Sequence, residues 1–346
     1  MRNIRELSAS VRRLWRGSET SRPPTPVGGW LILGAVAATL AAGYAWAAGA
    51  FTDRLTPDRI IDRQQGAEPH AGFRRAHAKG LCISGYFRSS GALAPLSRSA
   101  IFASGRDTPF VGRFSIGGNN PTAPDLKAGG RSLALDFRLA DGERWRTAMN
   151  TPPVLAVRTP EDFFAQIGAA RPDPATGKPD PARVAAFNAA HPEGAEFYTW
   201  QKIYKPSGSW ASERYHSINA FELVDAGGVR RPVRWRAEPI AGWEPVGQGP
   251  GDALQQELLG RLRQGPVRFQ LIFTLAGQGD RADDPSRSWP ANRKQVSAGT
   301  LVIEAAHLQR GGACDGLNFD PLVLPDGIAP SDDPILHARG GAYAES

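Results

Sequence analysis

The chain has 346 residues, of which 41% are hydrophobic, so it can bury the core of one large domain or two small ones and is not a disordered protein. The formal net charge is +7, but residues 1–22 hold six Arg against two Glu and so supply +4 of it. The body is therefore close to neutral, which argues against a nucleic-acid-binding protein, since such a surface needs Lys and Arg clustered on the folded domain.

An apolar run near the N-terminus predicts a transmembrane helix. No charged residue and no His lies between Arg22 and Asp53. A helix over Trp30 to Phe51 is ~33 Å long at ~1.5 Å per residue, which is enough for a bilayer core of ~30 Å.

The charges on either side of this run predict its orientation. Arg residues precede it, whereas the flank after it has mixed sign. The positive-inside rule then predicts a basic cytoplasmic tail over residues 1–26, a transmembrane anchor over 27–52 and a body over 53–346. We expect a single-pass protein of the cell inner membrane with a periplasmic body.

A cleaved signal peptide is the alternative, because the small residues Ala45, Ala47 and Ala48 lie near the end of the run. A buried core helix is not expected, since the run has no polar face. With either of the first two interpretations the body leaves the cytoplasm. An oxidising compartment would allow Cys82 and Cys314 to pair, and two separate buried thiols are the open alternative.

The body is predicted to be an α+β domain whose strands form a closed antiparallel barrel with inserted helices. Short apolar or alternating runs broken by turn residues predict the strands, and Thr-Pro or Asp-Pro pairs predict helix starts. The predicted strands are 80–87, 112–117, 131–139, 144–149, 154–157, 218–224, 229–235, 267–275 and 300–305, and the predicted helices begin at Pro57, Pro160, Pro181 and after Asp252.

Single residues carry little chemical information in this body. None of its six His has a close metal-ligand spacing, and GxSxG, P-loop and dinucleotide motifs are absent from the sequence.

An ordered set of short segments is more specific. They are Arg74–Gly80, with the sequence RRAHAKG, Gly112–Ser115, Asn150–Pro152 and Arg339–Tyr343. Together they resemble the haem catalases, in family order from about residue 57 to residue 346. The chain is most similar to their short catalase-related peroxidase branch, which keeps the haem barrel and lacks the C-terminal helical domain.

The resemblance implies that Tyr343 is the axial ligand of the iron of haem b. A tyrosinate favours ferric haem, and Arg339, four residues earlier on the same helix face, can hydrogen-bond the phenolate.

On the other side of the haem, the resemblance implies that His77 and Asn150 are the catalytic residues. His77 would move a proton between the two oxygens of a peroxide, and Asn150 would orient the peroxide. Ser115 would hold the His77 ring. Arg74 and Arg113 would pair with the haem propionates.

The chain also departs from typical catalases. Gly117 replaces a Val that narrows their channel, and Val154 and Leu155 replace two Phe. The sequence ends three residues after Tyr343, so their later helices are missing. A wider, shorter approach to the haem predicts a peroxidase that reduces hydrogen peroxide or organic hydroperoxides with an external electron donor, which the sequence does not identify.

Other functions stay open. A catalase that dismutates hydrogen peroxide is the first alternative, and a non-catalytic haem-binding or haem-sensing protein held at the membrane is another. A hydroperoxide-rearranging enzyme is disfavoured, because Ala76 stands where the allene oxide synthases have a Thr. Assembly of several copies into a homo-oligomer is also left open.

Overall fold

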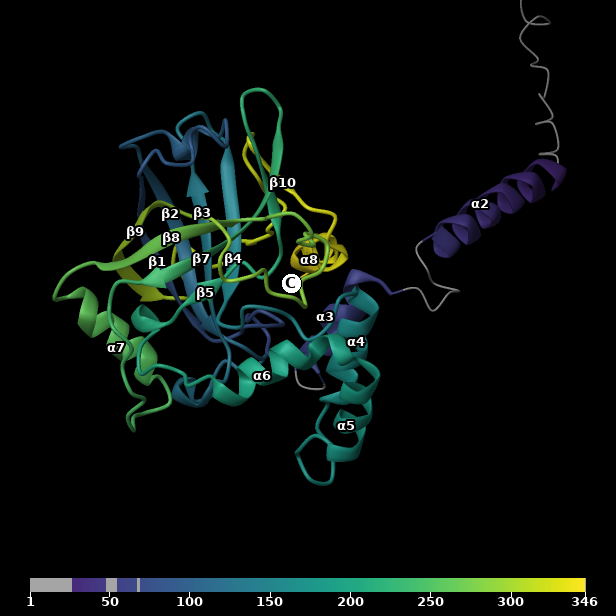
Figure 1. The fold of residues 1–346 in the computed structure, drawn as a ribbon. Coiled ribbons are helices and arrows are strands. Elements are labelled where there is room, and N and C mark those ends of the chain that lie inside the picture. Colours follow the sequence, from purple (N-terminus) through teal and green to yellow (C-terminus); the bar gives the residue numbers. More distant parts are fainter. Residues whose placement is uncertain (1–26, 48–54, 67–68, 346) are drawn as a thin grey trace, which may run out of the picture. The chain divides into compact units, whose positions relative to one another are not determined.

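The computed structural model describes residues 27–47, 55–66 and 69–345 (Figure 1). The chain divides after Arg54 into two compact units. In the first, helix α2 covers Val27–Ala47, and its window Gly29–Trp46 has a mean hydropathy of 1.4 with none of it buried. By length and composition this helix could cross a membrane or serve as a signal sequence. The predicted tail and the end of the predicted anchor lie outside the described residues.

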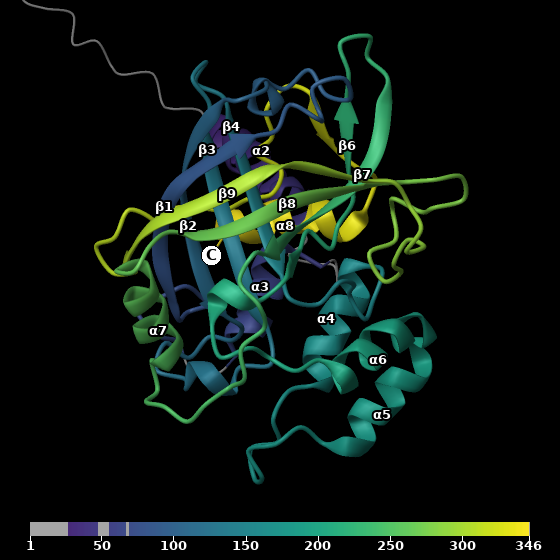
Figure 2. The same cartoon turned by 60° about the vertical axis from the view of Figure 1, so that its left-hand side comes forward.

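The second unit is built on an antiparallel barrel (Figures 1 and 2). The strands are β1 Gly80–Ser89, β2 Asp107–Ile116, β3 Arg131–Arg138, β4 Arg144–Asn150, β5 Tyr215–His216, β6 Phe221–Val224, β7 Arg230–Pro239, β8 Val267–Leu275, β9 Gln295–Leu308 and β10 Ile328–Pro330. In the order β7-β5-β4-β3-β2-β1-β9-β8 they form a ring that the β7–β8 pairing closes, while β6 and β10 extend from β7. The predicted closed barrel is confirmed.

Side chains from alternate positions of the strands fill the barrel. Phe114, Leu133 and Met149, on three neighbouring strands, are fully buried in the same apolar cluster. Aromatic rings pack at its centre, where Trp145 stacks on Phe137 at 4.9 Å between ring centres. Successive residues of a strand point to opposite faces, so the neighbours of these residues lie on the outer face of the barrel.

Helices cover part of the outside. They are α3 Pro57–Gln65, α4 Pro160–Ala169, α5 Pro181–Ala190, α6 Ala195–Ile203, α7 Ala253–Leu262 and α8 Pro334–Glu345, and short 3₁₀ turns cover Ala100–Phe102, Asp125–Lys127, Pro192–Gly194 and Trp210–Ser212. Helices α3, α4 and α8 pack on one another. Figure 2 shows α4, α5 and α6 grouped together, apart from α7.

All four predicted helix starts, at Pro57, Pro160, Pro181 and after Asp252, are confirmed. Thr56 and Thr159 cap α3 and α4, their hydroxyls accepting hydrogen bonds from the backbone N–H of Arg59 and Asp162. The predicted strand at residues 154–157 is wrong, since these residues form a loop. Pro152 and Pro153 have no N–H to donate to a ladder, and the apolar run is instead explained by burial of Val154 and Val157.

The two cysteines form a disulfide. Cys82 lies on β1 and Cys314 lies in the loop that leads toward α8, at a sequence separation of 232. Both are buried, and Leu317, Phe319 and Tyr343 pack around them. The bond therefore ties the C-terminal part of the chain to the barrel wall.

Replacing both cysteines, as Cys82→Ala with Cys314→Ala, should lower the free energy of unfolding by about 2–5 kcal/mol, because the disulfide restricts a long loop of the unfolded chain. Chemical denaturation of the purified protein would measure the change. Wild-type protein unfolded in the presence of reductant is the control and should resemble the double variant. Equal stability of the oxidised wild type and the variant would contradict this role.

Candidate active site

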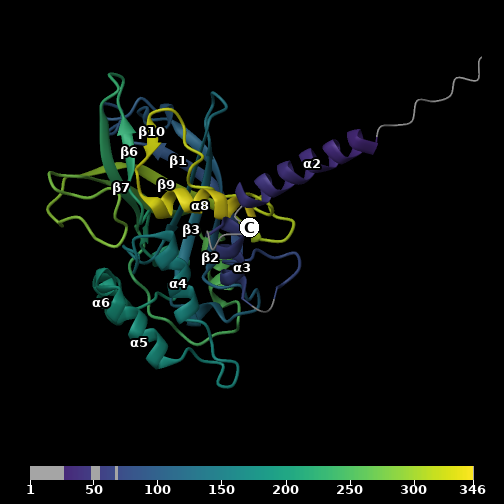
Figure 3. The same cartoon turned by 90° about the vertical axis from the view of Figure 1, so that its right-hand side faces the viewer.

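One cavity brings the predicted site residues together. It has a volume of about 220 Å³ and lies between the outer face of strands β2, β3 and β4 and the helices α3, α4 and α8. Figure 3 shows α8 lying beside the strands, with α3 and α4 next to it. All seven predicted residues line the cavity: Arg74, His77, Arg113, Ser115, Asn150, Arg339 and Tyr343.

Four of the six side chains that form the barrel wall of the cavity are small, namely Ser or Ala. Two rows of directly paired residues cross the strands β2, β3 and β4, and they point away from the apolar core. One row is Ser115, Ser132 and Asn150, and the other is Arg113, Ala134 and Ala148. Such a surface can lie against a planar ligand.

Helix α8 forms the opposite wall. Arg339 and Tyr343 line the cavity one helical turn apart, together with the small residues Ala338 and Ala342. The guanidinium carbon of Arg339 lies 5.8 Å from the centre of the Tyr343 ring. Tyr343 thus lines the same cavity as His77 and Asn150, but it comes from a different element of the fold.

Arg339 is held by a buried polar chain that the sequence did not suggest. Its Nη1 donates to Asn219 Oδ1 at 2.5 Å and its Nη2 to the Ala148 carbonyl at 3.1 Å. Asn219 Nδ2 in turn donates to Asp333 Oδ2 at 2.7 Å. Asp333 also accepts from the backbone N–H of Ile335 at the start of α8. The only signal in the sequence was Asp333 before Pro334, which is typical of a helix start.

His77 has an unusual backbone. Its φ is +54°, in the left-handed region that residues other than Gly rarely adopt. Ile218, with φ +64°, also lines the cavity. Among the described residues these are the only non-glycine positions with positive φ. Strained conformations of this kind gather at functional sites, where the surrounding packing holds them.

The contact to the His77 ring differs from the prediction. Ser115 lines the cavity, but the hydroxyl beside the ring belongs to Ser132, whose Oγ lies 3.3 Å from His77 Nδ1. The same Oγ donates a hydrogen bond to Asn150 Oδ1. Strand β3 lies between β2 and β4, so a side chain on β3 can reach both.

The buried charges explain the protonation state of His77. Burial, followed by the positive charges of Arg113, Arg339 and Arg74, lowers the pKa of His77 from 6.5 to about 4. The ring is therefore neutral near pH 7 and can accept a proton.

Arg74 and Arg113 bring positive charge that no ion pair within the described residues offsets, and the carboxylate of Asp315 acts on both only at longer range. Burial and the charge of Arg74 lower the pKa of Arg113 to about 9, and burial lowers the pKa of Arg74. Arg113 Nε donates to Gln309 Oε1 at 2.8 Å, and Arg74 donates to the carbonyls of Cys314 and Leu317. Within the described residues, neither has a carboxylate at ion-pair distance. An anionic group would suit this part of the cavity.

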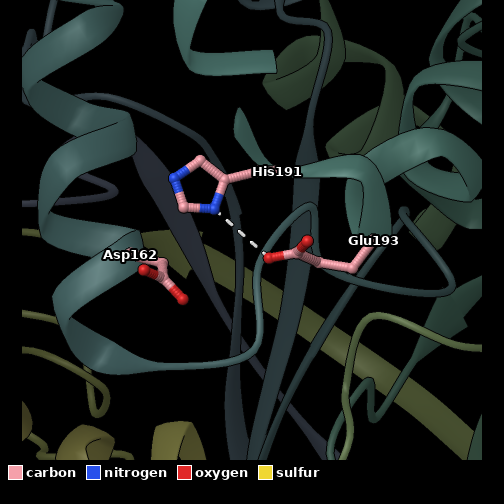
Figure 4. Close-up of side chains that lie close together, drawn as sticks. All are labelled: Asp162, His191 and Glu193. Carbon is pink, nitrogen blue, oxygen red and sulfur yellow. Dashed lines mark hydrogen bonds and ion pairs between the residues drawn. The ribbon is translucent and has the colours of Figure 1, made fainter. Parts of the chain in front are cut away.

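A second group of potential ligands lies outside the cavity lining (Figure 4). The ligand atoms of Asp162, His191 and Glu193 are all within 4.8 Å of one another. His191 Nδ1 is hydrogen-bonded to Glu193 Oε1 at 3.2 Å, and the three side chains are partly exposed. That hydrogen bond accounts for the arrangement, and we assign no ion to it.

Comparison with known sequences places the chain in a family. The family described as Catalase matches residues 69–258. The chain is 38% identical to a catalase-related peroxidase of Synechococcus elongatus over 92% of this chain and 95% of that protein. It is 36% identical to a catalase-related peroxidase of Mycolicibacterium paratuberculosis over 84% and 94%, respectively. The chain therefore belongs to the catalase family.

Solved catalase structures share the fold. A bacterial catalase superposes with a TM-score of 0.70 at 19% identity, over 79% of this chain and 56% of that one. Catalase A from Saccharomyces cerevisiae also superposes with a TM-score of 0.70 at 19% identity, over 79% of this chain and 60% of that one. The chain thus spans little more than half the length of these catalases, whereas it spans nearly all of the catalase-related peroxidases.

Proposed function

We propose that the protein is a haem-dependent peroxidase that reduces hydrogen peroxide or organic hydroperoxides with electrons from an external donor. The observation that carries the proposal is the cavity, which brings together Tyr343 on α8, the neutral His77 just before β1 and the Asn150 amide on β4. The similarity over nearly the full length of two catalase-related peroxidases supports the same activity.

The residues of the cavity fit haem b. Small side chains on both walls leave room for a planar ring, and the Tyr343 phenol offers a hard oxygen ligand for iron. Arg74 and Arg113, which form no ion pair within the described residues, would hold the propionates. Arg339 would steady the phenolate of Tyr343. Bound haem would supply the iron at which the O–O bond of a peroxide is cleaved.

The chain's own residues move the proton. Neutral His77 would take a proton from one oxygen of the peroxide and return it to the other, leaving oxygen. Asn150 accepts a hydrogen bond from Ser132 at Oδ1, so its Nδ2 is left to donate to the peroxide. The two groups therefore have different roles. His77 transfers the proton, and Asn150 orients the substrate without titrating.

We also propose that the catalytic domain, residues 53–346, lies outside the cytoplasm at the cell inner membrane. The apolar helix α2 is long enough for an anchor, and six Arg precede it in the sequence. The Cys82–Cys314 disulfide supports an oxidising compartment, because such bonds are rare in proteins of the cytosol.

Replacing Tyr343 with Phe should abolish or grossly alter the haem absorption spectrum, because the ring remains to pack against the disulfide but the ligand oxygen is lost. Absorption spectra of the purified proteins at equal concentration would measure this. Tyr198→Phe, in a helix outside the cavity lining, is the matched control and should keep the wild-type spectrum. An unchanged spectrum in Tyr343→Phe would assign the iron to another ligand.

Replacing His77 with Ala should retain haem but slow the reaction with peroxide at least ~100-fold, the scale of one positioned acid-base group. A protonated ring cannot accept a proton. The wild-type rate should therefore stay level above pH 6.5 and fall as the pH drops below it, with a midpoint between 6.5 and about 4. Stopped-flow absorption would follow both effects. His307→Ala, an exposed residue on β9, is the control. A wild-type rate in His77→Ala would contradict the role of His77.

Adding bulk at Leu155, which lines the cavity, should reduce turnover of cumene hydroperoxide about tenfold more than turnover of hydrogen peroxide, because the larger substrate loses room. Steady-state assays of Leu155→Phe with an aromatic donor would measure the ratio. Gly117 was predicted to widen the approach, but it is absent from the cavity lining. Gly117→Val is therefore the control. Equal losses for both substrates would show that Leu155 does not set the size limit.

A further inference from the structure

Ser132 occupies a central position in the barrel wall of the cavity. It pairs with Ser115 on β2 and with Asn150 on β4, and it is 8% exposed. Its Oγ lies 3.3 Å from His77 Nδ1 and donates to Asn150 Oδ1. One hydroxyl thus contacts both His77 and Asn150, the two residues that act on the peroxide in the proposed function.

The Ser132 hydroxyl has a single proton, and this determines which nitrogen of His77 carries a proton. A serine hydroxyl has one proton and two lone pairs, and the proton goes to Asn150. Toward His77 the oxygen can then only accept, which requires the proton of the neutral ring to be on Nδ1. The Nε2 lone pair is left as the base.

The orientation of the Asn150 side chain depends on Ser132 more strongly than the orientation of the His77 ring does. In the described part of the chain, the Ser132 hydroxyl is the only group found hydrogen-bonded to the Asn150 side chain. This bond fixes which end of the amide faces the barrel wall. Without it the amide can rotate and present its oxygen to the peroxide, which also carries lone pairs.

We infer that Ser132 is a positioning residue for the peroxide reaction, whose hydroxyl holds the Asn150 amide with its donor toward the substrate and links it to His77. The inference rests on the proposed function. Ser115, one strand away in the same row, cannot replace it, since β2 is not a neighbour of β4.

Ser132→Ala should keep the haem spectrum and slow the reaction with hydrogen peroxide about tenfold, the scale of one lost hydrogen bond. The Kd for cyanide, which accepts a hydrogen bond when bound to ferric haem, should rise by a similar factor in a spectral titration. In an Asn150→Ala background, Ser132→Ala should change either value less than about twofold, since the group it positions is gone. Ser99→Ala, a buried serine whose hydroxyl has no partner in the described residues, is the matched control.

Two outcomes would overturn the inference. One is a wild-type rate and wild-type cyanide affinity in Ser132→Ala, while His77→Ala is slow. The other is an equal loss with and without Asn150, which would show that Ser132 does not act through the amide. A wild-type protein that neither binds haem nor reacts with peroxide would instead overturn the proposed function.

Discussion

The cavity depends on the register of three neighbouring strands. In β2, β3 and β4, alternate residues fill the apolar core, and the residues between them form the cavity wall. A slip of one residue in β3 would turn Ser132 and Ala134 inward and bring Leu133 to the wall. The closed ring of strands opposes such a slip, because each strand is paired on both sides. The same hydrogen-bond ladder thus fixes both the core and the arrangement of the site.

Helix α8, which forms another wall of the cavity, is not part of the hydrogen-bonded sheet. Its position therefore depends on contacts with residues distant in the sequence. Arg339 is joined through Asn219 to Asp333, and the disulfide ties residue 314 to β1. Asp333 is fully buried, and burial raises the pKa of its carboxyl despite the hydrogen bond from Asn219. Loss of Asn219 would leave the buried carboxyl of Asp333 and the partly buried guanidinium of Arg339 without their shared partner, which is costly. The placement of α8 therefore depends on a few specific residues.

Local patterns predicted much of the fold. Alternating runs indicated β1 to β4, Thr-Pro pairs indicated α3 and α4, and an ordered set of motifs indicated the seven residues that line one cavity. Contacts between strands could not be predicted in this way. Ser115 and Ser132 have the same residue type and face, and only the order of the strands shows that the second reaches both His77 and Asn150. The role of Asn219 was also not predicted. It follows Ile218, which has a positive φ, and no pattern in the sequence indicates that backbone conformation.

The charges of the site connect cofactor binding to the chemistry of the base. Arg74 and Arg113 lower the pKa of His77, and their own pKa values are lowered by burial. An anionic group bound to these two guanidiniums would offset their charge and raise all three pKa values. Burial, the first cause of the lowered pKa of His77, does not depend on that group and would continue to lower the pKa of the ring. Binding of an anion at Arg74 and Arg113 would therefore raise the pKa of His77 through these two charges, while burial of the ring would oppose that rise.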